Sequence, residues 1–245
     1  MAKKIKDYYD VECAKLIADK IKSVYTDFDT IGFVDYLEKN LSDKEMLERQ
    51  DIFVKAFERY MPYDYKGNIS IFEKILGVEL DTTVGMYKSG WRLWPIGRYV
   101  EKYGDTDLDT TLKFLYQLTK RFTGEFAIRP ILSRYPKQTL ETMLSWTKDK
   151  NVHIRRLAAE WARISLPRAK KMMTAIEYFD LYSKILDSLK DDDIKFVQKS
   201  VWNNLNDLMK VDPEKAYKII SSREKNNPTK NTLWIIKHGL RSLRK

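Results

Sequence analysis

A single acidic side chain stands among basic ones on one face of a predicted helix that begins near Val152. Steps of 100° per residue place four polar residues on this face: His153, Arg156, Glu160 and Arg163. A carboxylate in such a position can act electrostatically on a nearby positive charge, and the flanking cations can bind anions. The same spacing fits an exposed helix with local ion pairs to Glu160, worth only about 0.3–0.5 kcal/mol each. Spacing alone leaves both interpretations open.

A second polar stripe lies on a helix predicted to begin at Ile194, and its members are Ser200, Asn203, Asp207 and Lys210. If the two helices belong to adjacent repeats, they pack roughly 10 Å apart. Glu160 and Asp207 would then face a common groove. Ordinary solvated surface is the alternative for this stripe.

Helical periodicity positions both stripes and runs through almost the whole chain. No segment alternates with a period of two over a useful length. Glycine and proline number only 9 and 7, too few for the many tight turns of a sheet protein. We therefore predict an all-α fold. The predicted helices cover 6–24, 31–40, 44–60, 69–76, 92–103, 108–121, 126–134, 138–147, 152–165, 178–189, 194–210, 213–222 and 230–243.

Two segments resemble each other at a shift of 42 residues, Leu144 to Ala162 and Leu186 to Asn204. Each has an aspartate at the turn between helices, Asp149 and Asp191, followed by matching apolar positions. An aspartate turn before an apolar helix, repeated at about 40 residues, is typical of HEAT-like stacked helix pairs. We predict a HEAT-like solenoid whose basic concave groove is lined by the second helix of each pair. A plain helical bundle is the alternative.

The excess positive charge is confined to one half of the chain. The net charge is +10, yet residues 1–125 carry 20 basic and 22 acidic side chains, whereas residues 126–245 carry 25 and 13. This asymmetry favours a localised positive surface for nucleic acid, with a generic lysine-rich surface as the alternative. No long polar linker divides the chain. We therefore expect one helical domain over 1–245, near-neutral in 1–125 and basic in 126–245.

The composition excludes several other classes of protein. Cys13 is the only cysteine, and with two histidines it provides neither an internal disulfide nor a structural zinc site, so we expect no metal and no cofactor. Cys13 has no activating pattern nearby and is expected to be buried and inert. The N-terminus is charged throughout and no stretch approaches 18 apolar residues, so we expect no signal peptide, no membrane contact and a cytoplasmic location. We also expect a monomer.

Four ordered segments in the C-terminal 120 residues resemble the AlkC group of bacterial DNA alkylation-repair glycosylases, which are HEAT-like proteins related to the AlkD group. They read FTGEFAIRPIL at 122–132, TLETMLSWTKDKNVHIRRLAAE at 139–160, SVWNNLNDLMKVDP at 200–213 and TLWIIKHGLRSL at 232–243. A weaker echo is WRLWPIGRYVEKYG at 91–104. Ordered matches over four segments are more specific than any single short motif.

The resemblance implies a monofunctional glycosylase that removes cationic alkylated bases, such as 3-methyladenine, from double-stranded DNA in base excision repair. It also implies that the lesion is not flipped out of the duplex. Carried onto this chain, the family's functional positions make Glu160 the group that stabilises the sugar cation or positions water, with Asp207 as the second carboxylate. A catalytically inactive DNA-binding relative and a protein-binding scaffold are the alternatives.

The resemblance further implies phosphate contacts from Arg156 and Arg163. Additional DNA contacts are expected from His153, Arg168, Lys210, Trp234 and Arg241. The chain departs from the family pattern at Trp161, where the family has glycine, and at Arg168, where the family has a tryptophan expected to contact DNA near the lesion. We expect these departures to affect activity and lesion preference more than DNA binding.

Overall fold

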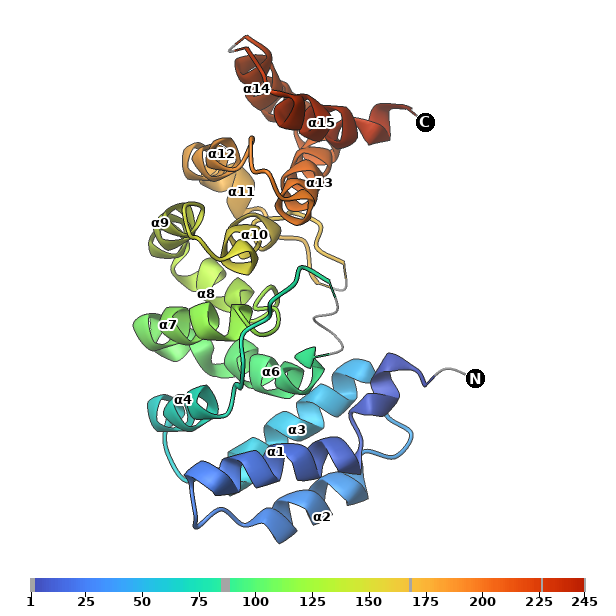
Figure 1. The fold of residues 1–245 in the computed structure, drawn as a ribbon, viewed down its shortest axis with the longest axis vertical. Helices are drawn as coiled ribbons and strands as arrows, with labels where there is room; N and C mark the ends of the chain where they lie inside the picture. The colour runs from blue at the N-terminus through green and yellow to red at the C-terminus, as the bar shows by residue number, and fades with distance from the viewer. Residues whose placement is uncertain (1–2, 85–88, 168, 226, 245) are drawn as a thin grey trace. The chain divides into compact units, whose positions relative to one another are not determined.

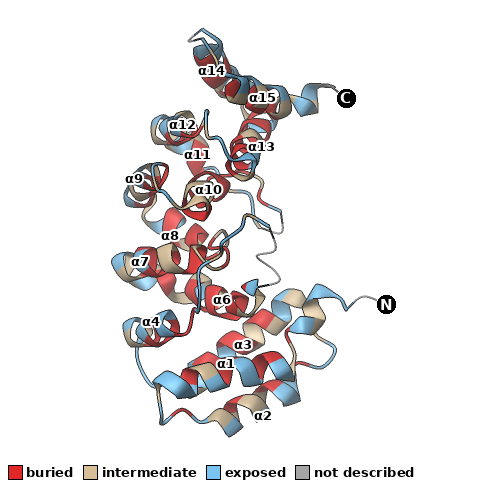
Figure 2. Ribbon diagram, in the orientation of Figure 1, coloured by how far each residue is buried: buried red, intermediate tan, exposed pale blue. Residues whose placement is uncertain are grey.

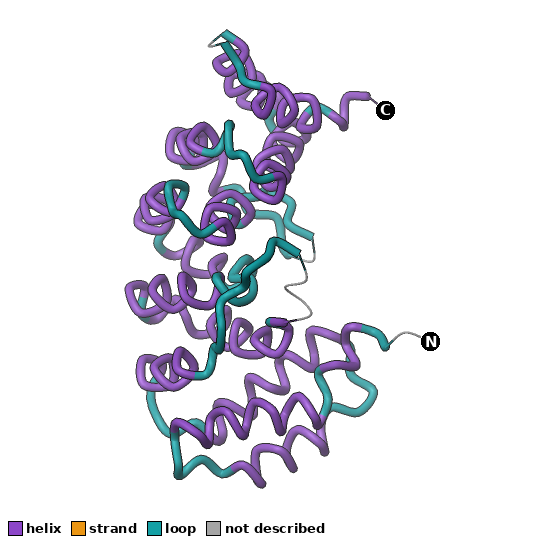
Figure 3. Tube along the Cα trace, viewed as in Figure 1, coloured by secondary structure: helices purple, strands orange, loops and turns teal. Residues whose placement is uncertain are grey.

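The computed structural model describes residues 3–84, 89–167, 169–225 and 227–244 as helices joined by loops (Figures 1 and 3). This part of the chain contains 14 α-helices and no strand, which confirms the all-α prediction. The chain divides into two compact units, Met1–Pro130 and Ile131–Lys245. The first unit carries 21 basic and 22 acidic side chains and the second 24 and 13, so the positive excess lies in the C-terminal unit. The single continuous domain stays a prediction.

Four helices of the N-terminal unit begin at aspartates that cap them. Asp10, Asp29, Asp64 and Asp107 each accept a hydrogen bond from the backbone N–H three residues on. These bonds satisfy donors that the first turn of a helix leaves unpaired. Ring contacts among Phe57, Phe72 and Tyr99 then join three of the helices within the buried core (Figure 2). The helices are α1 (Val11–Val24), α2 (Thr30–Asn40), α3 (Met46–Tyr60), α4 (Tyr65–Lys74), α6 (Trp94–Tyr103) and α7 (Leu108–Thr119), and α8 (Ile128–Arg134) crosses the boundary between the units.

Helix pairs stack into two layers in the C-terminal unit. One layer consists of α10, α13 and α15, in which α13 contacts both α10 and α15. The other layer consists of α9, α12 and α14, which lie beside the first layer (Figure 1). This arrangement is the stack of helix pairs that the repeat pattern predicts. The bounds are α9 (Pro136–Trp146), α10 (Val152–Glu160), α11 (Thr174–Glu177), α12 (Phe179–Ser188), α13 (Lys195–Val211), α14 (Pro213–Glu224) and α15 (Lys230–Gly239).

The turns inside two of these pairs are built alike. Asp149 and Asp192 each accept a hydrogen bond from the N–H two residues on, at 2.7 and 2.9 Å. Arg155 then donates to the carbonyl of Asp149 at 2.9 Å, and Gln198 donates to the carbonyl of Asp192 at 2.6 Å. Both correspondences are 43 residues apart, so the repeat is one residue longer at this point than the sequence match indicates.

Asp191 was expected at the equivalent turn, and the structure corrects this. Its carboxylate accepts hydrogen bonds from Thr229 and Thr232 at the start of α15, the latter at 2.8 Å. The corrected register also pairs Ile154 with Val197, both completely buried, in place of the half-buried Phe196. The two repeats are therefore aligned by which helix residues are buried, and not by the matching aspartates in the sequence of the turns.

Helix α10 ends at Glu160, five residues earlier than the periodicity predicts. Trp161 is completely buried, and the N–H of Arg163 bonds only three residues back, to the Glu160 carbonyl at 3.4 Å, a tightened geometry typical of helix ends. Pro167 lies ahead, where it would break a continuing helix. Arg163 therefore lies beyond the helix, in a segment of turns.

Helix α15 approaches α13 closely at Gly239. A Cβ at this buried position would lie 2.8 Å from the Cβ of Leu205. The side-chain amide of Asn206 donates to the Gly239 carbonyl at 3.1 Å. A 3₁₀ turn, Arg241–Arg244, follows, whereas the sequence predicts a helix to residue 243.

Candidate active site

The two predicted carboxylates come from neighbouring helices of the α10–α13–α15 layer. Glu160 is the last residue of α10, and Asp207 lies within α13. Ser200 precedes Asp207 by two helical turns and faces the same side. Because α10 and α13 pack directly against each other, the structure brings together four members of the two polar stripes: Glu160, Arg163, Ser200 and Asp207.

Arg163 joins the two carboxylates. Its Nη1 lies 3.0 Å from Glu160 Oε1, and its Nε lies 3.0 Å from Asp207 Oδ2. Ser200 donates from Oγ to Glu160 Oε2 at 2.6 Å. All four are buried, with exposed fractions of 6% for Glu160, 8% for Arg163, 2% for Ser200 and 4% for Asp207. These four residues are called the carboxylate cluster below.

Backbone groups around the carboxylate cluster fix its geometry. The N–H of Ser165 donates to Asp207 at 3.3 Å, and the carbonyl of Ser165 accepts from Arg163 at 3.3 Å. Asn204 on α13 donates to the carbonyl of Ala159 on α10 at 2.8 Å. The turn after α10 is thereby tied to α13, which holds both carboxylates in place.

Glu160 stays ionised although it is buried. Desolvation raises its pKa, but the charges of Arg156 and Arg163 and the hydrogen bond from Ser200 lower it, and the resulting pKa lies below the ordinary value. For Arg163, desolvation lowers the pKa, whereas the charges of Glu160 and Asp207 raise it above its ordinary value. Glu160 therefore supplies a fixed negative charge at neutral pH.

Arg163 lies inside the carboxylate cluster, and its expected phosphate contact stays a prediction. Its guanidinium bonds Glu160, Asp207 and the Ser165 carbonyl, and these donors point into the protein. Arg163 is an internal counter-ion in this structure. The alternative of an exposed helix with local ion pairs is wrong. Glu160 makes ion pairs with Arg156 and Arg163, but it is buried.

His153 and Arg156 occupy different environments on α10. His153 is 2% exposed, and its ring packs edge-on against Phe196 with centroids 5.7 Å apart. The His153 ring thus packs inside the C-terminal unit, and its expected DNA contact stays a prediction. Arg156 lies over the same Phe196 ring at 5.0 Å, 3.7 Å from Glu160, and keeps 14% of its side chain exposed. Its phosphate contact stays a prediction.

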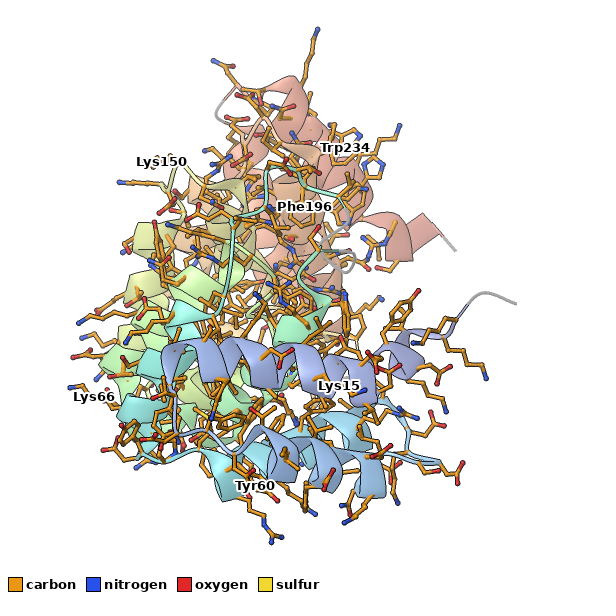
Figure 4. The ribbon with its side chains drawn as sticks, turned by 60° about the horizontal axis from the view of Figure 1, so that its bottom comes forward. Lys15, Tyr60, Lys66, Lys150, Phe196 and Trp234 are labelled. Carbon is orange, nitrogen blue, oxygen red and sulfur yellow. The ribbon has the colours of Figure 1, made fainter. Side chains whose placement is uncertain are left out.

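The other predicted DNA contacts lie farther along the chain. Lys210 is exposed in the last turn of α13. Trp234, labelled in Figure 4, lies on α15 and is half-buried. Arg241 is exposed just beyond that helix. Arg168 lies outside the described residues. DNA contact by these residues stays a prediction.

Sequence reasoning missed three residues of α13 close to the predicted contacts, Lys195, Phe196 and Trp202. The side chain of Trp202 stacks on the ring of His238 with centroids 4.4 Å apart. A signal was available, because cations and a tryptophan recur at spacings of 4 and 3 in Lys195, Lys199 and Trp202.

Within the described ranges of the chain, no group of three or more His, Cys, Asp or Glu side chains is placed to hold a metal ion. Cys13 is completely buried as predicted, and burial raises the pKa of its thiol. Within the same ranges, none of the helices has the length and apolar character needed to cross a membrane.

Stacked helix pairs with ionised side chains held between them define an all-helical repeat protein with a buried carboxylate site. The family model described as DNA alkylation repair enzyme matches residues 96–243, and the chain belongs to this family. The resemblance inferred from the four sequence segments is thereby confirmed.

Two relatives match nearly the whole chain. The uncharacterized protein YhaZ of Bacillus subtilis (strain 168) is 32% identical over 245 residues, covering 98% of this chain and 65% of YhaZ. The Pseudomonas fluorescens alkylpurine DNA glycosylase AlkC, in a structure bound to DNA containing an abasic site analog, is 32% identical with a TM-score of 0.86. That match covers 100% of this chain and 66% of AlkC. The chain spans about two thirds of the length of both relatives.

Proposed function

We propose that this protein is a DNA glycosylase that excises cationic N-alkylated bases, of the 3-methyladenine type, from duplex DNA. The observation that carries the proposal is the pair of buried carboxylates, Glu160 and Asp207, both bonded to Arg163. Membership of the DNA alkylation repair family and the similarity to AlkC support it.

Loss of a cationic base needs little acid or base assistance. A purine alkylated at N3 or N7 already carries a positive charge, so it can leave without a proton from a general acid. Positive charge then develops on the deoxyribose, where a fixed carboxylate stabilises it. We assign to Glu160 the role of stabilising the sugar cation or positioning the attacking water. Asp207 is the second carboxylate for the same task. Because charges interact strongly in a protein interior, a carboxylate that is 6% exposed can act without direct contact.

The cations that contact the carboxylates are arginines, Arg156 and Arg163. An arginine does not form a Schiff base with a sugar aldehyde, so the proposed reaction ends at an abasic site with the strand intact. Arg156, at the edge of the carboxylate cluster, is proposed to neutralise a backbone phosphate. Following the family resemblance, the protein acts without flipping the lesion. The proposal also includes a single copy of the chain and no cofactor.

A catalytically inactive DNA-binding relative is the second candidate. The observation that favours it is charge balance, because Arg163 lies against both carboxylates and Arg156 lies 3.7 Å from Glu160. Two cations beside two carboxylates weaken the field available to a sugar cation. A kinetic assay separates the two candidates.

Release of methylated adenine from alkylated duplex DNA tests the proposal. The purified protein should release the base, detected by chromatography, and the strand should break only after alkali treatment. Glu160→Gln and Asp207→Asn remove charge but keep size, so each should slow release by about 10²-fold or more. Their duplex affinity should hold or increase, because a negative charge leaves a phosphate-binding surface. Asp193→Asn, at an exposed position, is the control and should keep the parental rate.

The outcomes separate the hypotheses. If both carboxylate variants keep the rate of an active parent, the two-carboxylate mechanism is wrong. If the parent binds duplex but releases no base from several alkylated substrates, the inactive relative is correct. If it binds no duplex at low salt, both DNA hypotheses are wrong.

A further inference from the structure

Three aromatic rings form a compact group between α13 and α15. The ring centroids of Trp202, Trp234 and His238 lie 4.3 to 4.5 Å from one another. Each of the three side chains is only half-buried. Burial of an indole inside the protein would stabilise the fold. Adjacent indoles that stay partly exposed are therefore typical of interaction sites.

Two cations lie over these rings. The Nζ of Lys195 is 3.5 Å from the centroid of Trp234, and the guanidinium of Arg241 is 5.9 Å from that of Trp202. Such contacts are worth about 0.5–1 kcal/mol at exposed sites, enough to orient a flexible side chain. The group formed by these five residues is called the aromatic cradle: Lys195, Trp202, Trp234, His238 and Arg241.

Hydrogen bonds hold the cations and the histidine of the aromatic cradle in place. Arg241 donates to Asn203 Oδ1 at 2.9 Å and to the His238 carbonyl at 3.0 Å. Lys195 donates to Gln198 Oε1 at 2.7 Å. The Nδ1 of His238 lies 2.7 Å from the carbonyl oxygen of Trp234, which can only accept, so Nδ1 is the donor.

The aromatic cradle borders the carboxylate cluster. Asn203, which holds Arg241, lies on α13 between Ser200 and Asp207. Desolvation lowers the pKa of Arg241, and the charges of Asp207 and Arg163 also act on it, which places Arg241 within electrostatic reach of both.

The contact between α10 and α13 also places a cation over an aromatic ring. There Arg156 lies over the ring of Phe196. A cation over an aromatic ring therefore occurs at both helix–helix contacts of this layer, α10 with α13 and α13 with α15. The layer thus presents Arg156, Lys195 and Arg241 as a set of oriented positive charges (Figure 4 labels Phe196 and Trp234).

We propose that the aromatic cradle binds the phosphodiester backbone of duplex DNA beside the carboxylate cluster, an inference that rests on the proposed function. The rings contact one another and the two cations, so the cradle presents charge rather than a free ring face for base stacking. The C-terminal unit has 24 basic against 13 acidic side chains, which complements a polyanion. Lys195 and Arg241 are the phosphate ligands, and the rings position them.

Binding of undamaged duplex, followed by fluorescence anisotropy over a series of salt concentrations, tests the aromatic cradle. Arg241→Gln and Lys195→Gln should each weaken binding several-fold and reduce the log–log salt slope by about 0.9, the value for one phosphate contact. Trp202→Leu keeps apolar bulk but removes the ring beneath Arg241, so it should weaken binding with less change in slope. Lys218→Gln is the matched control, because Lys218 lies 5.6 Å over Phe179, on the side of the unit formed by α12 and α14, and should bind like the parent.

Unchanged affinity and slope in both Arg241→Gln and Lys195→Gln would overturn the proposal, and so would equal losses in the Lys218→Gln control. These substitutions are at exposed positions, so the proposal can be tested even if Trp202→Leu does not fold. The measurement uses undamaged DNA and is independent of base release. A parent that releases no base, with weakened binding in the two cradle variants, would refute the glycosylase activity and leave the cradle supported.

Discussion

Glu160 experiences opposing influences on its protonation. Burial raises its pKa, whereas Arg156, Arg163 and Ser200 lower it, and the balance lies below the ordinary value of 4.5. A carboxylate with a lowered pKa in the folded state adds stability above its unfolded pKa, and that contribution is lost as the pH falls through the folded-state value. We therefore expect Glu160 to keep its charge, and its contribution to stability, in mildly acidic solution.

Replacing Arg163 with Gln should move the acidic side of the pH–rate profile for base release to higher pH. The substitution removes a positive charge 3.0 Å from Glu160, so desolvation is less opposed and the carboxylate is protonated at a higher pH. Single-turnover rates between about pH 4 and pH 8, a range that reaches below the ordinary pKa of a glutamate, measure the shift. Arg155→Gln, on the same helix but paired with Asp192, is the control and should keep the parental profile.

Removing one partner of a buried ion pair can cost about 3–5 kcal/mol, so Arg163→Gln needs a companion variant. Arg163→Lys keeps the positive charge while losing the planar fork. It should preserve most of the acidic side of the profile at a lower melting temperature. Identical pH–rate profiles for the parent, Arg163→Gln and Arg163→Lys would contradict the role of Arg163 as counter-ion.

At the scale of elements, the contact between α13 and α15 decides the shape of the aromatic cradle. Gly239 lets the two helices approach, and Asn206 bonds across the same contact. At this separation of the helices, the rings of Trp202 and His238 stack with centroids 4.4 Å apart. A change that separates α15 from α13 should therefore affect both stability and DNA affinity.

Gly239→Ala should lower the free energy of unfolding by about 1–3 kcal/mol, as overpacking does elsewhere. The new Cβ would lie 2.8 Å from that of Leu205, and this clash outweighs the gain in helix propensity of about 1 kcal/mol. Urea unfolding measures the change. Gly97→Ala on α6 is the control, because its Cβ would meet Leu118 at an ordinary 3.7 Å and should be neutral or slightly stabilising. Equal stability of Gly239→Ala and the parent would show that the helices can separate without cost.

At the scale of the whole molecule, the position of the charge matters more than its total. The N-terminal unit has 21 basic and 22 acidic side chains and the C-terminal unit 24 and 13. Duplex binding driven by counterion release depends on the cations that contact phosphates, not on net charge alone. The two units should therefore respond differently to the same loss of charge.

Two triple variants with the same change in net charge test this. Lys195, Lys199 and Lys237, all exposed in the C-terminal unit, are changed to Glu in one protein. Lys15, Lys55 and Lys66, all exposed in the N-terminal unit, are changed to Glu in the other. The first variant should lose most of its duplex affinity in an anisotropy titration, and the second should lose much less. Equal losses in the two would mean that net charge, rather than the C-terminal unit, drives binding.

The sequence by itself determined the all-α class, most helix positions to within a few residues, and the choice of Glu160 and Asp207 as candidates. These features are local, because the apolar period, the scarcity of glycine and proline, and the capping aspartates act over one or two turns of helix. The family motifs added the roles that we propose for the two carboxylates. Even the register of the repeat was nearly right, at 42 residues against 43.

Only the tertiary structure decided that Arg163 is an internal counter-ion, that His153 is buried, and that Trp202 meets His238. Helical spacing places Arg163 on the face of α10, but the helix ends at Glu160 and the arginine reaches Asp207, 44 residues away. Where a helix ends, and how closely two helices pack, depends on side chains distant in sequence, such as Leu205 against Gly239. Spacing and charge along the chain do not contain those contacts, because packing chooses among many arrangements that satisfy the same local pattern.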